Sequence, residues 1–140
     1  MNVQIDEGQI ILDRQTLRYN PYWIDIAAEE VSSNRLAVMQ QVLAQWAEAV
    51  AGLNREGQTL FLPYSLDDEW TECFEARLQG NYVVLQCVQV AFNGYSVELN
   101  NLSQFMHRAP EIRMKYPENF GQYQQAELVS ALRKASTSAP

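Results

Sequence analysis

Apolar and polar positions alternate along two neighbouring stretches, residues 70–79 and 82–92, and this period of two predicts a pair of strands. Gly80-Asn81 lies between them and suits a two-residue hairpin turn with glycine at its first central position. With that turn, Leu78 lies opposite Val83. The core face of the hairpin then carries Phe74, Ala76, Leu78, Val83, Leu85 and Cys87, and the other face carries Cys73, Glu75 and Arg77.

The two cysteines of the chain, Cys73 and Cys87, fall on opposite faces of this hairpin, so we expect no disulfide between them. They also lack the C-x-x-C spacing of a metal or redox pair. The sequence therefore predicts neither a disulfide framework nor a cysteine-bound metal.

Over residues 34–52, apolar residues recur at spacings of three and four, which predicts a long helix. We expect this helix to lie across a sheet, with Trp46 near the centre of the contact. Its polar side is marked by Gln41, Gln45 and Glu48. Its apolar face carries Leu36, Met39, Leu43, Trp46 and Val50.

Shorter patterns predict the remaining elements. Strands are expected at residues 9–13 and 16–20, joined at Arg14 and Gln15, at residues 59–63, ended by Pro63, and at residues 95–99 after a turn at Asn93-Gly94. Helices are expected at residues 21–31, 102–108, 110–115 and 122–134.

The fold class that follows is α+β. We expect an antiparallel sheet, a meander of about four strands plus an N-terminal hairpin, with the long central helix and the C-terminal helices packed on it. Residues 1–134 form a single domain in this interpretation, and residues 135–140 form a disordered C-terminal tail.

Charge narrows the possible partners. The 140 residues include 17 acidic and 10 basic side chains, for a formal net charge of −7. Nucleic acids and anionic membrane surfaces are poor partners for such a chain, because binding there depends on neutralising phosphates with Lys and Arg. No apolar stretch reaches the length of a membrane span, and the first residues lack the pattern of a secretory signal, so a cytoplasmic location is expected.

Motifs for the common enzyme classes are absent. The chain has no P-loop, no G-x-G-x-x-G, no G-x-S-x-G and no H-E-x-x-H pattern. We therefore assign no catalytic residue, no metal and no cofactor from the sequence, and we favour a non-enzymatic role.

The densest group of charges is acidic. Asp67, Asp68 and Glu69 are followed closely by Glu72 and Glu75, with no basic residue among the five. Such a segment is compatible with a solvated turn, with a docking surface for a basic protein, or with a divalent cation, although its spacing matches no known calcium loop. Tyr64 and Trp70 bracket this acidic segment, and aromatic rings beside carboxylates could hold a Lys or Arg of a partner by cation–π and ion-pair contacts together. The predicted partner-binding set is Asp67, Asp68, Glu69, Glu72, Tyr64 and Trp70.

A second set of side chains could bind a small ligand. Glu75 and Arg77 lie together on the face of the hairpin opposite the core face, and His107 and Arg108 lie together at a predicted helix end. His107 is the only histidine, and histidine is a common acid–base group, but a cation at a helix C-terminus also interacts favourably with the helix dipole.

Three functions are compatible with these observations. The first is an interaction module, of the immunity, inhibitor or adaptor kind, that presents an acidic, aromatic-edged surface to a basic partner. The second is a small-molecule binding protein or enzyme that uses polar residues on the sheet face. The third is a structural subunit that associates with copies of itself through an exposed strand or through Ala37, Ala44 and Ala51.

Overall fold

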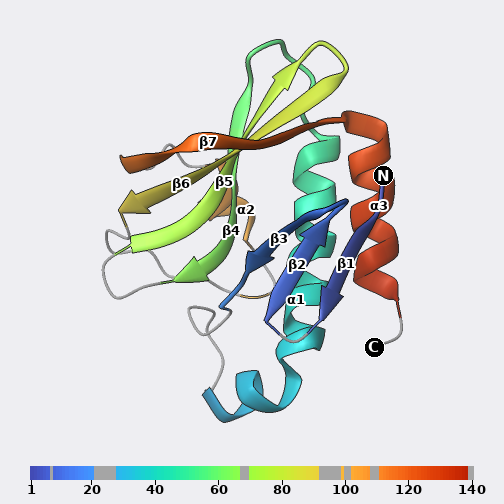
Figure 1. Cartoon of the computed structure of the whole chain (residues 1–140), viewed down its shortest axis with the longest axis vertical. Coiled ribbons are helices and arrows are strands. Elements are labelled where there is room, and N and C mark those ends of the chain that lie inside the picture. Colours follow the sequence, from blue (N-terminus) through green and yellow to red (C-terminus); the bar gives the residue numbers. More distant parts are fainter. Residues whose placement is uncertain are drawn as a thin grey trace.

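The protein has the predicted α+β fold, and its described residues form two antiparallel sheets and three helices (Figure 1). The computed structural model describes residues 1–6, 8–20, 28–66, 70–91, 99, 102–107 and 111–138. The strands are β1 (Val3–Asp6), β2 (Gln9–Leu12), β3 (Gln15–Arg18), β4 (Thr59–Leu66), β5 (Trp70–Gln79), β6 (Tyr82–Ala91) and β7 (Ile112–Gln124). The helices are α1 (Ala28–Ala51), α2 (Ser103–His107) and α3 (Gln125–Thr137).

The N-terminal sheet has the order β1-β2-β3. The predicted hairpin is present as β2 and β3, and β1 is an additional strand. The predicted connection at Arg14 and Gln15 is wrong by one residue, because Leu12 pairs with Gln15 and the turn is Asp13-Arg14. Asp13 has a positive φ of 54°, which aspartate tolerates better than most residues, and its carboxylate accepts a hydrogen bond from the Asn2 N–H at 2.7 Å.

Helix α1 confirms the long helix predicted over residues 34–52. Residues 28–33 form a separate helical segment before it, which includes the end of the helix predicted over residues 21–31. Asn34, with a φ of −131°, interrupts the helical geometry between the two segments. Trp46 is 1 % exposed, as predicted, and its Nε1 donates to the Pro63 carbonyl at 3.2 Å. Gln45 is predicted on the polar side of the helix, but its side chain is half-buried. Its amide nitrogen donates to the Leu99 carbonyl, and its amide oxygen accepts from the Leu102 N–H.

The second sheet has the order β4-β5-β6-β7, and its central hairpin has the predicted register. Leu78 pairs with Val83 and Phe74 pairs with Cys87, across a turn in which Gly80 has a φ of +60°. The two cysteines are therefore free and on opposite faces. The face opposite the predicted core face is also largely buried, since Cys73 is 0 % exposed and Glu75 is 7 % exposed.

Both edge strands of this sheet pass through a proline, and both predictions based on those prolines are wrong. β4 continues three residues beyond Pro63, and residues 112–115, predicted to be helical, belong to β7, which continues through Pro117. An edge strand tolerates proline because one side of its backbone forms no ladder. Each strand also has an irregular register next to its proline, at Pro63/Ser65 in β4 and opposite Gln86 and Val88 in β7.

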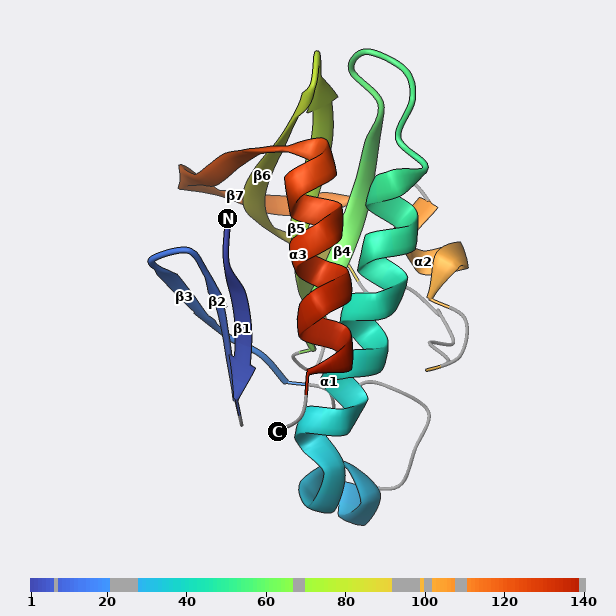
Figure 2. The ribbon, with the colours of Figure 1, turned by 90° about the vertical axis from the view of Figure 1, so that its right-hand side faces the viewer.

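Helix α3 starts three residues later than predicted, at Gln125, and ends at Thr137. Residues 135–137 are thus helical, and Ala135 is 3 % exposed, where the sequence predicts a tail. The Gln125 amide donates to the carbonyls of Val50 and Leu53, both at 2.9 Å, which satisfies acceptors at the end of α1. The two helices pack side by side and run in opposite directions (Figure 2).

The two sheets lie on either side of a common core. Strand β1 packs against both α1 and α3, while Trp46 of α1 contacts Phe74 of β5 edge to face at a centroid distance of 5.8 Å. In Figure 2 the N-terminal sheet and α2 lie on opposite sides of the α1–α3 pair. Helix α2 confirms a predicted helix and packs on β4, where Phe105 and Met106 are buried.

Four predicted features fall partly or wholly outside the described residues: the helix over residues 21–31, of which residues 28–31 are described, the acidic turn, the turn at Asn93-Gly94 with the strand that follows, and Arg108. No helix in the described part of the chain combines the length and the apolar composition that a membrane crossing requires.

Candidate functional site

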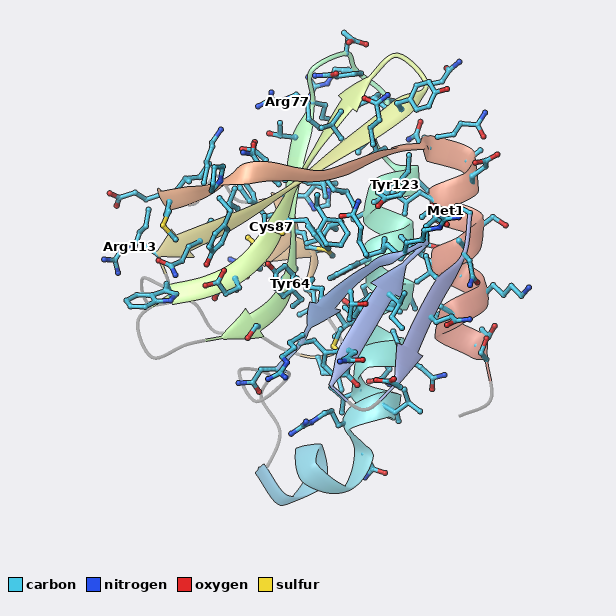
Figure 3. The ribbon with its side chains drawn as sticks, viewed as in Figure 1. Met1, Tyr64, Arg77, Cys87, Arg113 and Tyr123 are labelled. Carbon is cyan, nitrogen blue, oxygen red and sulfur yellow. The ribbon has the colours of Figure 1, made fainter. Side chains whose placement is uncertain are left out.

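A cavity of about 500 Å³ separates strand β3 from the face of the second sheet. Figure 3 shows two of its side chains, Tyr64 and Cys87, next to each other in the space between the sheets. One wall is β3, with Gln15, Thr16, Leu17 and Arg18. The other wall is the four-stranded sheet, with Tyr64, Ser65, Glu72, Cys87, Tyr116 and Phe120.

Glu72 is the acidic group of this cavity, and its carboxylate is held in place by two neutral donors. The Tyr116 hydroxyl donates to both carboxylate oxygens at 2.8 Å, and the Gln89 amide donates to Oε1 at 2.9 Å. Among the described residues no cation forms an ion pair with Glu72. Neutral donors fix the orientation of a carboxylate without neutralising it, so the half-buried charge remains available to a cation in the cavity.

Irregularities in the two edge strands place Tyr64 of β4 and Tyr116 of β7 at the cavity. In β4, Pro63 pairs with Cys73 and Ser65 pairs with Glu72, which leaves Tyr64 as the extra residue. A bulge re-aims side chains, and here it lets Tyr64 and Ser65 both line the cavity although they are consecutive. Strand β7 is likewise irregular around Tyr116, between the residues that pair with Gln86 and Val88.

Burial keeps the hydroxyl and thiol groups of the cavity neutral. Burial, followed by the neighbouring Cys87 thiol, raises the pKa of Tyr64 far above the ordinary tyrosine value. Burial also raises the pKa of Cys87. The pKa of Tyr116 is raised to about 12, first by burial and then by its hydrogen bond to Glu72. Cys87 is thus a thiol rather than an activated thiolate, which argues against its use as a nucleophile.

Aromatic rings form the apolar part of the cavity and connect it to the core. Phe74, behind the lining, stacks at a tilt on Tyr64 at 5.1 Å and on Phe120 at 4.8 Å between ring centroids. The same ring contacts Trp46 of α1. Because Phe74 is 0 % exposed and held on three sides, both aromatic walls rest on a rigid support.

The structure divides the predicted partner-binding set. Tyr64 is 4 % exposed, and it lines the cavity together with the half-buried Glu72. The Trp70 ring already has a cation over it, since the Arg113 guanidinium carbon lies 4.6 Å from the ring centroid. Asp67, Asp68 and Glu69 lie outside the described residues.

The predicted ligand-binding set does not line this cavity. Glu75 lies on the opposite face of β5 from Glu72 and forms ion pairs with Arg77 at 3.4 Å and with Lys115 at 3.5 Å. These contacts neutralise a nearly buried carboxylate, which is a structural role.

His107 is exposed at the end of α2. Its Nδ1 lies 3.0 Å from the Ser103 carbonyl and 3.3 Å from the Ser103 hydroxyl. This contact between residues one helical turn apart is local, and Arg108 lies outside the described residues.

Sequence reasoning did not identify Arg18, Cys87, Gln89 or Tyr116 as site residues. Tyr116 follows directly on residues 110–115, for which the sequence analysis predicts a helix rather than a strand. The alternation of Ile112, Met114 and Tyr116 with Arg113 and Lys115 is the signal that could have shown a strand.

Comparison with known proteins assigns no family. The chain matches no protein-family model, no curated protein and no solved structure. No group of three or more histidine, cysteine or acidic side chains able to hold a metal ion occurs in the part of the chain that the structure describes.

Proposed function

We propose that this protein binds a small organic cation in the cavity between β3 and the second sheet. The observation that carries the proposal is the Glu72 carboxylate. It accepts hydrogen bonds from Tyr116 at both oxygens and from Gln89 at Oε1, but it pairs with no described cation. An ammonium group in the cavity would supply the missing countercharge.

The rest of the lining supports a ligand with an apolar body. The tyrosine and phenylalanine rings of the cavity offer flat surfaces, and ligand sites in general combine such a lining with a few oriented polar groups. Its volume of about 500 Å³ falls within the range of about 300–1,000 Å³ that is usual for small-molecule sites. An aromatic or aliphatic amine meets both requirements.

Two other functions stay predictions of the sequence. One is an acidic surface for a basic protein, formed by Asp67, Asp68, Glu69, Glu72, Tyr64 and Trp70, of which Tyr64 and Glu72 line the cavity. The other is self-association through the alanines of α1, and Ala37, Ala44 and Ala51 are all exposed.

Calorimetric titration with a matched pair of compounds tests the proposal. Benzylamine carries the ammonium group, and benzyl alcohol keeps the ring without the charge. We expect the affinity for benzylamine to be at least about tenfold higher than that for benzyl alcohol, because a hydrogen bond to a charged group contributes about 1.5–3 kcal/mol.

Glu72→Gln provides the internal test, because it removes the charge and keeps the shape. We expect this variant to lose the preference for benzylamine. Glu48→Gln is the matched control, since Glu48 is an exposed carboxylate of α1 that pairs with Arg133 outside the cavity. Equal affinity for the two compounds in the parent protein, or an unchanged preference in Glu72→Gln, would contradict the proposal.

A further inference from the structure

The opposite wall of the cavity carries a charge of the other sign. Arg18, the last residue of β3, lines the cavity together with Glu72. Its side chain is exposed, so the guanidinium can meet a ligand that enters from solvent. The cavity therefore has an acidic residue in the wall formed by the second sheet and a basic residue in the wall formed by β3.

These two charges do not neutralise each other. Arg18 and Glu72 form no ion pair, and no carboxylate of the described residues pairs with Arg18. The rest of the lining includes Leu17, Tyr64 and Phe120, which are apolar or aromatic residues. Opposite charges held apart across an apolar cavity create a local field that favours a ligand with two complementary charges.

Arginine is suited to one kind of group in particular. Its planar guanidinium presents paired N–H donors that match the two oxygens of a carboxylate. Thr16 and Gln15 lie on the same strand and also line the cavity, so further donors are available near that end.

We infer that the ligand is a zwitterion, an amino-carboxylate whose ammonium group is bound by Glu72 and whose carboxylate is bound by Arg18, with an apolar spacer between them. The inference rests on the proposed function, because Glu72 holds the ammonium group in both. It adds the second charge and the spacer, and so it specifies the chemical class of the ligand.

A set of three compounds with one ring separates the two claims. Benzylamine has the ammonium group alone, benzoate has the carboxylate alone, and para-(aminomethyl)benzoate has both at opposite ends of the ring. We expect the zwitterion to bind about tenfold more tightly than benzylamine in calorimetric titration, and benzoate to bind most weakly.

Arg18→Gln removes the second charge from an exposed position, where it should leave the fold intact. We expect this variant to bind the zwitterion no more tightly than benzylamine, and the affinity for benzylamine not to fall, because Arg18 carries the same charge as the ammonium group and does not attract it. Arg14→Gln is the matched control, since Arg14 lies in the β2–β3 turn and lines a different cavity. Urea unfolding of both variants checks that stability is kept.

The outcomes distinguish the two claims. If benzylamine and para-(aminomethyl)benzoate bind equally and Arg18→Gln changes neither, the inference of a zwitterion is wrong while the proposed function stands. If Glu72→Gln also leaves the binding of both amines unchanged, the proposed function fails as well. A gain for the zwitterion that Arg18→Gln abolishes and Arg14→Gln preserves supports the inference.

Discussion

Trp46 connects the long helix to the sheet that carries the cavity, and its removal offers a quantitative test of the fold. The indole is 1 % exposed, meets the Phe74 ring at 5.8 Å and 77°, and donates to the Pro63 carbonyl. Emptying a buried tryptophan site costs about 3–5 kcal/mol, a figure that includes the ring contact. We therefore expect Trp46→Ala to lower the free energy of unfolding by about 4 kcal/mol.

A second variant separates packing from hydrogen bonding. Trp46→Phe keeps a ring against Phe74 but leaves the Pro63 carbonyl without its indole donor, so we expect a smaller loss of about 1–3 kcal/mol. Equilibrium urea unfolding followed by circular dichroism gives both values, and an unchanged m-value shows that the unfolding transition is the same. Tyr82→Ala is the control, because Tyr82 is 47 % exposed and should change stability by about 0.5 kcal/mol or less. A loss for Trp46→Ala as small as that of the control would refute this packing of α1 on the sheet.

Three further predictions concern the second sheet. Tyr116 should titrate at a pKa of about 12 in the phenolate absorbance difference between the parent protein and Tyr116→Phe. Because the folded-state pKa is raised, the contribution of Tyr116 to stability should be full below about pH 10 and lost as the pH rises through about 12. Glu72→Gln should lower this pKa only partly, since burial remains. Gly121→Ala should destabilise the protein by about 1–3 kcal/mol in urea unfolding, because the added Cβ would lie 2.8 Å from the hydroxyl oxygen of Tyr123. An unchanged midpoint of the unfolding transition would contradict this packing. A thiol reagent should modify half-buried Cys87 slowly in the native protein and reach fully buried Cys73 only after unfolding, and the absence of two free thiols in the unfolded, unreduced protein would contradict the register of the hairpin.

The sequence was sufficient wherever a local pattern determines the structure. Gly80-Asn81 sets the turn, and the turn sets the register of the whole β5–β6 hairpin, so the faces of Phe74 and Cys73 followed from counting. The spacing of apolar residues likewise placed Trp46 in the core. These inferences need no knowledge of distant parts of the chain.

The candidate site depends on pairing between distant segments, and so most of it could not be predicted. Glu72 and its donor Tyr116 are 44 residues apart and meet only because β7 pairs with β6. Proline also misled the prediction, since an edge strand accepts Pro63 or Pro117 where a central strand would not. Arg18 gave no signal at all, because its importance arises from the placement of one sheet opposite the other.

The affinity of para-(aminomethyl)benzoate for the parent protein, Glu72→Gln and Arg18→Gln tests the account most directly. We predict measurable binding to the parent protein, a loss of about tenfold in Arg18→Gln, and a loss at least as large in Glu72→Gln. The same dissociation constant in all three proteins would show that the cavity charges bind no such ligand, and would contradict the account.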